Sequence, residues 1–182
     1  AEANEAAIKL CRKFGFDNGI KNPTIITMKG SFHGRTMATL SATGNEKVHH
    51  GFSPLLSGFK HVEFGNTDVL KSYLCNPDVV ALMVEPIQGE GGIKLPPLNY
   101  LRKLRELCTH YRKILVLDEA TSSLDNKTEA EVMNSIDLIN YQKKYDLIWI
   151  DGAHGYPVVC IDIINSLRLS TDRGLILCDD VY

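Results

Sequence analysis

The stretch that decides the fold is residues 114–125, which read I-L-V-L-D-E-A-T-S-S-L-D. Four consecutive apolar residues followed by two carboxylates predict a buried parallel strand that ends at Asp118 and Glu119. Open α/β sheets keep their binding sites at the carboxyl edge of their strands. We therefore expect Asp118 and Glu119 to lie at the functional edge of a sheet.

Further acidic residues follow apolar runs at a regular interval. Glu85 lies 33 positions before Asp118, Asp151 lies 33 positions after it, and Asp179 follows 28 positions later, beside Asp180. Each interval is about the length of one βα unit, and right-handed crossovers set such strands parallel with their ends along one edge. The predicted strands are residues 25–28, 61–64, 79–84, 114–117, 147–150 and 175–178.

Helical periodicity occupies the intervals between these strands. Leu101, Leu104 and Cys108 recur at helical spacing and indicate an amphipathic helix from residue 98 onward. Other helices are expected at residues 2–12, 36–41, 67–74, 126–141 and 157–169, and loops at 14–24 and over much of 34–59. The predicted class is α/β: a single doubly wound, mainly parallel sheet with helices on both faces, a Rossmann-like three-layer sandwich forming one domain over residues 1–182.

Composition and charge limit the classes of partner. The 182 residues are 44% hydrophobic and 23% charged, which is typical of a globular domain. The formal net charge is −2 and the basic residues are scattered, so we expect neither nucleic acid nor a membrane as partner. The five cysteines show no C-x-x-C pairing and no apolar run approaches ~18 residues. We therefore expect buried, reduced thiols in a cytoplasmic protein without a spanning or secretory segment.

Four motifs lie between residues 1 and 119. They are A-E-A-N-E-A-A-I-K at 1–9, S-F-H-G-R-T at 31–36, V-E-P-I-Q-G-E-G-G at 84–92 and L-D-E at 117–119. With them, residues 1–119 closely resemble the large domain of class III pyridoxal-phosphate aminotransferases, which include the acetylornithine and ornithine aminotransferases.

That resemblance implies roles for five residues. Phe32 would stack on the cofactor ring, and Asp118 would pair with its protonated pyridine nitrogen. Arg35 would hold the α-carboxylate of the substrate, because a guanidinium binds a carboxylate through two hydrogen bonds. Glu85 and Glu90 would lie on the substrate side. Class III aminotransferases are dimers, so the resemblance also implies a homodimer.

Two groups that this family uses are not found at the corresponding positions. Family members carry a serine-glycine phosphate-binding turn immediately before the A-E-A-N-E segment, and this sequence begins at Ala1. After L-D-E they continue with a glycine-rich stretch and then the lysine that forms the Schiff base, whereas this chain reads A-T-S-S-L-D. Lys127, Lys143 and Lys144 are expected to be solvated surface residues. We therefore expect covalent cofactor attachment and transamination to be lost.

Residues 114–136 resemble a second family, since they look like the Walker B strand and following loop of ABC-type ATPases. In that family Asp118 would bind magnesium and Glu119 would polarise the attacking water. The chain contains no G-x-x-x-x-G-K-[ST] phosphate loop and no ABC signature. ATP hydrolysis is therefore not expected.

Residues 145–182 resemble the C-terminal half of S-adenosylmethionine-dependent O-methyltransferases, with the motifs Y-D-L-I-W-I-D-G-A-H and G-L-I-L-C-D-D. In metal-dependent members of that family, acids at the positions of Asp151, Asp179 and Asp180 hold a divalent cation. Oxygen ligands of this kind suit Mg²⁺. The resemblance therefore implies a metal site at these three residues.

Together the resemblances leave several functions open. One is a chimeric or engineered α/β protein, assembled from the three enzyme fragments, that lacks intact native catalysis and requires no cofactor. A second is an acetylornithine/ornithine-type aminotransferase fragment that retains non-covalent binding of pyridoxal phosphate or substrate. A third is a divalent-cation-binding, methyltransferase-like remnant. Whether the chain is an enzyme stays open among them.

Overall fold

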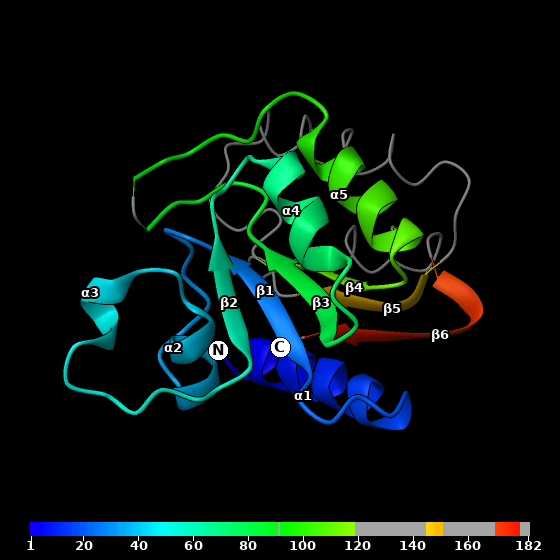
Figure 1. Cartoon of the computed structure of the whole chain (residues 1–182), viewed down its shortest axis with the longest axis horizontal. Helices are drawn as coiled ribbons and strands as arrows, with labels where there is room; N and C mark the ends of the chain where they lie inside the picture. The colour runs from blue at the N-terminus through cyan, green and yellow to red at the C-terminus, as the bar shows by residue number, and fades with distance from the viewer. Residues whose placement is uncertain (91, 119–144, 151–169, 179–182) are drawn as a thin grey trace. The chain divides into compact units, whose positions relative to one another are not determined.

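The computed structural model describes residues 1–90, 92–118, 145–150 and 170–178. The chain divides into two compact units, residues 1–118 and 119–182. The elements of the first unit are α1 (Glu2–Asp17), β1 (Thr24–Met28), α2 (Met37–Ala42), α3 (Glu46–His49), β2 (Phe59–Val62), α4 (Thr67–Leu74), β3 (Val79–Val84), α5 (Tyr100–His110) and β4 (Ile114–Leu117) (Figure 1). In the second unit, β5 (Tyr145–Ile150) and β6 (Ser170–Cys178) form a parallel pair.

The sheet of the first unit has the strand order β2-β1-β3-β4, and all its neighbouring strands are parallel. Met28 pairs with Val62, and Val84 pairs with Leu117. The carboxyl ends of the four strands therefore meet at one edge, as predicted. Because β1 and β3 lie between β2 and β4, the residues that follow β1, β3 and β4 become neighbours.

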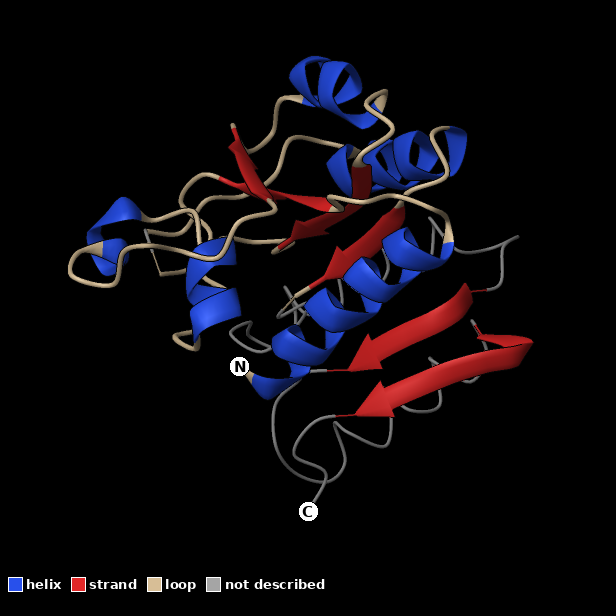
Figure 2. Ribbon diagram, turned by 60° about the horizontal axis from the view of Figure 1, so that its bottom comes forward, coloured by secondary structure: helices blue, strands red, loops and turns tan. Residues whose placement is uncertain are grey.

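Helices cover both faces of this sheet, with α1 on one face and α4 and α5 on the other (Figure 2). The cluster on the first face contains Ile8 and Cys11 of α1, Ala38 and Ala42 of α2, and Ile25, Val80, Ala81 and Met83 of the sheet. Burying one aliphatic side chain of this size contributes about 1.5–3 kcal/mol, so such clusters hold the strand ends in place. The α/β class with a parallel sheet is confirmed, and a single domain over residues 1–182 stays a prediction.

The first helix is longer than predicted, because it continues through Gly15 to Asp17. A Cβ atom at Gly15 would lie 2.7 Å from Cβ of Pro23 and 2.9 Å from Cγ1 of Val80. This glycine therefore allows α1 to approach the sheet closely, rather than ending the helix as its residue type suggests.

Several other elements match the sequence pattern, and a few differ. The predicted boundaries of α4, β3 and β4 are confirmed, and the side chain of Asn66 caps α4 by accepting a hydrogen bond from the Val69 amide at 3.1 Å. The second strand begins and ends two residues earlier than predicted, and the short helix α3 was not predicted. Cys11 and Cys108 are buried as expected, and burial raises the pKa of each thiol to about 12, but Cys75 is exposed.

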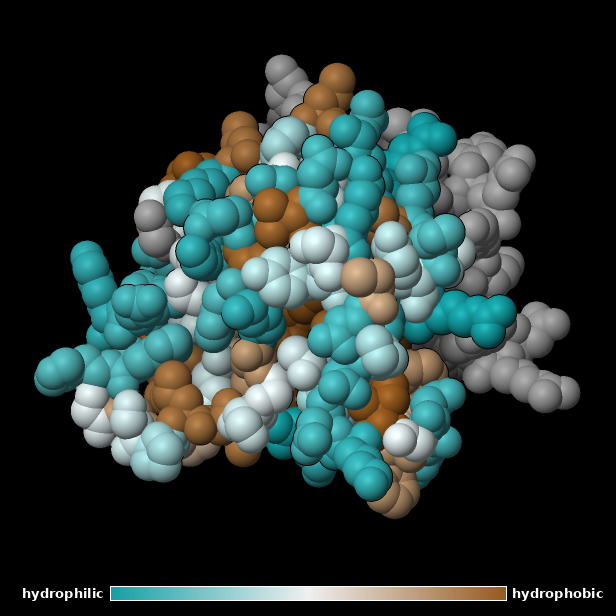
Figure 3. Space-filling model, viewed as in Figure 1, coloured by the Kyte–Doolittle hydropathy of each residue, from teal (hydrophilic) through white to brown (hydrophobic). Residues whose placement is uncertain are grey.

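The surface over α4 and α5 is mainly hydrophilic, with hydrophobic side chains near the loop that precedes α5 (Figure 3). Ile93, Leu95 and Leu98 of this loop are 81%, 68% and 88% exposed. Among the described residues, no helix combines the length and apolar character needed to cross a membrane.

Candidate functional site

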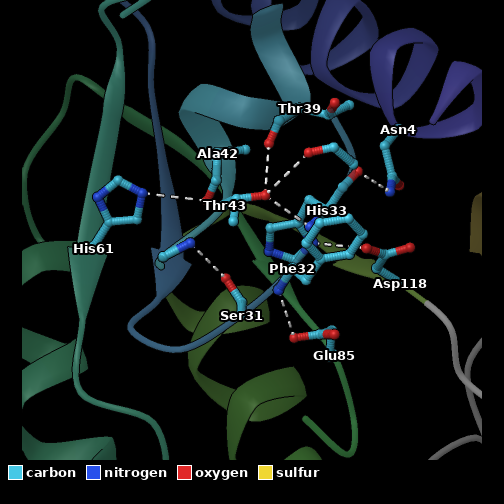
Figure 4. A network of polar contacts seen from close by, with 12 residues as sticks. Asn4, Ser31, Phe32, His33, Thr39, Ala42, Thr43, His61, Glu85 and Asp118 are labelled. Carbon is cyan, nitrogen blue, oxygen red and sulfur yellow. Dashed lines mark hydrogen bonds and ion pairs between the residues drawn. The ribbon is translucent and has the colours of Figure 1, made fainter. Parts of the chain in front are cut away.

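The candidate site lies where β1, β3 and β4 end. The loop after β1 carries Phe32 and His33, the residue after β3 is Glu85, and the residue after β4 is Asp118 (Figure 4). Asp118, just beyond β4, stays aligned with the end of β3, because its amide donates a hydrogen bond to the carbonyl of Val84 at 3.0 Å. The strand order thus brings together residues that are 53 and 85 positions apart in the sequence.

The buried centre of the site is the pair His33 and Asp118. Nδ1 of His33 lies 2.6 Å from Oδ2 of Asp118, and the two side chains are only 0% and 1% exposed. Because an ionised carboxylate can only accept hydrogen bonds, Nδ1 carries the proton in this contact. Within the described residues, Oδ1 of Asp118 and Nε2 of His33 are buried without a hydrogen-bond partner. Oδ2 of Asp118 is therefore held by the imidazole, whereas Oδ1 is open: it can still accept a hydrogen bond.

Side chains from three other elements hold the backbone of the loop that carries this histidine. The amide of Phe32 donates to Oε2 of Glu85 at 3.1 Å. The amide of His33 donates to Oγ1 of Thr43 at 2.9 Å, and the carbonyl of His33 accepts from Nδ2 of Asn4 at 2.9 Å. Although the loop has no regular secondary structure, buried side chains satisfy the amides of Phe32 and His33 and the carbonyl of His33.

Close backbone packing fixes the base of the same loop. Gly44 donates its amide to the carbonyl of Ser31 at 3.1 Å and accepts from the amide of Gly30 at 2.8 Å. A Cβ atom at Gly44 would lie only 1.9 Å from the carbonyl oxygen of Met28. The segment after α2 therefore contacts the end of β1 at a distance that only glycine permits.

The remaining predicted site residues lie around this centre. The aromatic ring of Phe32 is half-buried, and Cζ of Arg35 lies 5.8 Å from the centroid of that ring, with the arginine exposed. Glu85 is buried beneath the loop, whereas Glu90 is exposed in the turn between Gln88 and Lys94. The structure thus brings together Phe32, Arg35, Glu85 and Asp118.

The family model that matches this chain is described as aminotransferase class III, and it covers residues 1–124. That is more than half of the sequence. The chain belongs to the class III aminotransferase family. The resemblance of residues 1–119 to this family is confirmed, whereas the resemblances of residues 114–136 to ABC ATPases and of 145–182 to methyltransferases stay hypotheses.

Curated and solved relatives of this class III aminotransferase chain agree with that assignment. Acetylornithine aminotransferase from Nitrosomonas europaea is 50% identical over 125 residues, which cover 68% of this chain and 32% of the relative. Ornithine aminotransferase 2 from Staphylococcus aureus is 43% identical over an alignment of 203 residues, covering 96% of this chain and 51% of the relative. A crystal structure of ornithine aminotransferase from Toxoplasma gondii superimposes with a TM-score of 0.63 at 33% identity, covering 65% of this chain and 29% of that one. The chain spans between about a third and a half of the length of these curated relatives.

The remaining predicted site residues follow position 118. Glu119 and the predicted metal ligands Asp151, Asp179 and Asp180 lie outside the described residues. Among the residues that are described, no group of three or more His, Cys, Asp or Glu side chains is arranged to hold a metal ion.

Sequence reasoning missed three polar residues of the candidate site: Asn4, His33 and Thr43. Asn4 carried a detectable signal, because it lies on the helix face formed by Ala7, Ile8 and other buried residues. A polar side chain in an apolar helical stripe needs a buried partner. His33 lies between the two residues to which the family resemblance assigns roles, but its partner, Asp118, could be identified only from the strand order.

Two further histidines hold the C-terminal end of α2. Nε2 of His61 lies 3.2 Å from the carbonyl of Ala42, and Nε2 of His49 lies 3.0 Å from the carbonyl of Leu40 and 2.8 Å from that of Thr43. Carbonyls in the last turn of a helix and just beyond it need acceptor contacts outside the helix, although that of Leu40 also accepts from the Thr43 amide at 3.2 Å. The two imidazoles therefore help to hold the segment that contains Thr43.

Acid should destabilise the folded chain through His61. Burial is the main cause that lowers the pKa of His61 below its ordinary value of 6.5; the hydrogen bond to Ala42 opposes the shift and nearby His49 adds to it. Below pH 6.5 the unfolded chain takes up a proton here that the folded chain resists, so stability is lost as the pH falls through the lowered pKa. In urea unfolding at about pH 7.5 and 5.5, we expect His61→Gln to lose less stability on acidification than the original chain.

The matched control for this measurement is His50→Gln, which removes an exposed imidazole from the neighbouring segment. We expect its acid sensitivity to equal that of the original chain. If His61→Gln shows the same loss of stability between the two pH values as His50→Gln, then His61 does not contribute to the pH dependence.

Proposed function

We propose that residues 1–118 form the cofactor-binding part of a pyridoxal-phosphate-dependent aminotransferase of the acetylornithine/ornithine type, and that they bind the cofactor non-covalently. The family match supports this interpretation better than it supports a chimera without native function. A second solved ornithine aminotransferase from Toxoplasma gondii, at 32% identity, is described with pyridoxal phosphate at its active site.

The observation that carries the proposal is the open oxygen of Asp118. Oδ1 is buried and has no hydrogen-bond partner among the described residues, while Oδ2 is held by His33. A buried acceptor of this kind is costly unless a donor reaches it. The protonated nitrogen of a pyridine ring supplies one N–H donor and a positive charge, which complement a single carboxylate oxygen. The arrangement therefore fits the cofactor.

Neighbouring residues suit the other parts of the cofactor and substrate. The half-buried ring of Phe32 offers a flat apolar face to a planar cofactor. The exposed guanidinium of Arg35, held near that ring, suits the α-carboxylate of an amino-acid substrate. Glu85 accepts a hydrogen bond from the amide of Phe32 and so helps to orient the aromatic ring. Glu90 is proposed to face the amino group of the substrate.

The chemistry that the cofactor supplies when bound is an electron sink for the substrate carbon that loses its proton. Asp118 would hold the pyridine nitrogen through Oδ1 and so favour its protonated form. His33 keeps Oδ2 occupied, so that Oδ1 stays directed toward the cofactor. Phe32 excludes water from one side of the ring, and Arg35 determines which end of the substrate enters.

Equilibrium dialysis against pyridoxal phosphate tests this proposal directly. We expect the chain to bind the cofactor, and Asp118→Asn to weaken binding by about 10- to 100-fold, because a hydrogen bond to a charged group contributes about 1.5–3 kcal/mol. Asparagine retains the shape of the side chain and can still accept a hydrogen bond from His33, so the fold should survive, as circular dichroism would show.

The matched control is Asp78→Asn, because Asp78 is an exposed aspartate that precedes β3 at the opposite end of the strand. Its cofactor affinity should equal that of the original chain. The proposal is wrong if the original chain does not retain pyridoxal phosphate, or if Asp118→Asn and Asp78→Asn bind it equally well.

A further inference from the structure

The backbone of His33 is held from two opposite directions. Nδ2 of Asn4, on α1, donates to its carbonyl at 2.9 Å, and Oγ1 of Thr43, at the end of α2, accepts from its amide at 2.9 Å. Asn4 is 5% exposed and Thr43 is fully buried. Figure 4 shows the two side chains reaching the loop from different elements.

The hydroxyl group of Thr43 both accepts and donates in this arrangement. The oxygen accepts from the His33 amide, and the hydroxyl proton is directed to the carbonyl of Thr39 at 2.9 Å. A hydroxyl with one donor and one acceptor engaged has a fixed orientation. The amide of Asn4 likewise has a defined direction, because only its NH₂ group can donate to a carbonyl.

Fixing both peptide groups of a residue leaves its side chain with little freedom beyond its own rotamers. The imidazole of His33 must place Nδ1 within 2.6 Å of Oδ2 of Asp118, and a contact this short tolerates little displacement. Gly34, which follows, has φ of +127°, and a Cβ atom there would lie 2.7 Å from Oγ1 of Thr39. The loop can therefore lie this close to Thr39 only with glycine at position 34.

We propose that Asn4 and Thr43 are positioning residues that set the geometry of the His33–Asp118 hydrogen bond and, through it, the direction of the open oxygen of Asp118. Both residues act here through the backbone of His33. Their effect on cofactor affinity rests on the proposed function, whereas their effect on the hydrogen bond does not. The two effects can therefore be measured separately.

Proton NMR of the cofactor-free chain reads the hydrogen bond directly, because the proton in a short imidazole–carboxylate contact resonates far downfield. We expect one such signal, assigned to His33 by its loss in His33→Gln. Asn4→Asp keeps the size of the side chain but replaces the donating amide with a carboxylate that repels the carbonyl of His33. We expect this variant, and Thr43→Val, to shift or abolish the signal.

Equilibrium dialysis gives the second readout. Because a single hydrogen bond contributes about 0.5–1.5 kcal/mol, we expect each of these two variants to weaken binding of pyridoxal phosphate by about two- to tenfold. Thr43→Ser, which retains the hydroxyl, should restore both the signal and the affinity. A role in stability alone would lower the melting temperature without moving the signal.

Matched controls exist elsewhere in the first unit. Asn18 donates its side-chain amide to the carbonyl of Phe14 at 2.8 Å at the exposed end of α1, so Asn18→Ala removes the same kind of bond far from the loop. Thr24→Val removes an exposed hydroxyl at the start of β1. We expect both controls to retain the signal and the affinity.

The outcomes separate the two proposals. A signal that moves in Asn4→Asp and Thr43→Val, with no cofactor bound by any variant, supports the positioning role and contradicts the proposed function. An unchanged signal in folded Asn4→Asp and Thr43→Val overturns the positioning role. If Asn4→Asp does not fold, the pair Thr43→Val and Thr43→Ser decides: equal signals in both would overturn it.

Discussion

Gly44→Ala is expected to lower the free energy of unfolding by about 3 kcal/mol, because the new methyl group has no space. Its Cβ would lie 1.9 Å from the carbonyl oxygen of Met28 and 2.9 Å from Cα of Lys29. Both are backbone atoms at the end of β1, so no side-chain rotation relieves the overlap. The two segments must separate, which breaks the 2.8 Å hydrogen bond from Gly30 to Gly44.

The control for Gly44→Ala is Gly89→Ala, where a Cβ atom would meet nothing within 4 Å. Chemical unfolding followed by circular dichroism should show a large loss of stability for the first variant and a change within about 0.5 kcal/mol for the second. Similar stabilities of the two variants would mean that the segment after α2 does not need its close contact with β1.

His33→Leu is expected to have an effect of comparable or larger size, about 3–5 kcal/mol, because it leaves the carboxylate of Asp118 buried without its partner. Both side chains of this pair are almost completely inaccessible to solvent. The exposed pair Lys29 and Glu63, with N···O at 2.6 Å, provides the contrast. Lys29→Met should cost far less than His33→Leu, since water replaces the lost partner.

A double-mutant cycle tests the origin of this loss. Adding Asp118→Asn to His33→Leu removes the unpaired charge, so we expect the double variant to be more stable than His33→Leu alone. The coupling energy from urea unfolding should lie at about 1–3 kcal/mol. Additive effects of the two substitutions would show that the hydrogen bond between His33 and Asp118 contributes nothing to stability.

Local sequence patterns predicted the elements that depend on local physics. The bounds of β3, an apolar run, and of α4 were both predicted correctly. Gly15 was misassigned to a loop because its role depends on Pro23 and Val80, which approach it only after the helix packs on the sheet. Propensity does not contain that information.

The candidate site was predictable only in part, because some of its contacts form only when distant segments pack together. Asp118 was placed at the carboxyl edge of the sheet from its position after an apolar run, and the hydrogen bond from its amide to the carbonyl of Val84 confirms that placement. Its contact with His33 follows from the strand order β2-β1-β3-β4, which no local pattern specifies. Phe32 and Arg35 were identified through family resemblance, and their roles stay predictions.

The distances along the chain between partners of His33 have a consequence for biosynthesis. Asn4 precedes the histidine by 29 positions and Asp118 follows it by 85. At the usual speed of translation, a ribosome needs on the order of ten seconds to release the later partner after the histidine has emerged. During that interval the nascent polypeptide can form α1 and β1, but the candidate site stays incomplete until β4 and Asp118 have been synthesised.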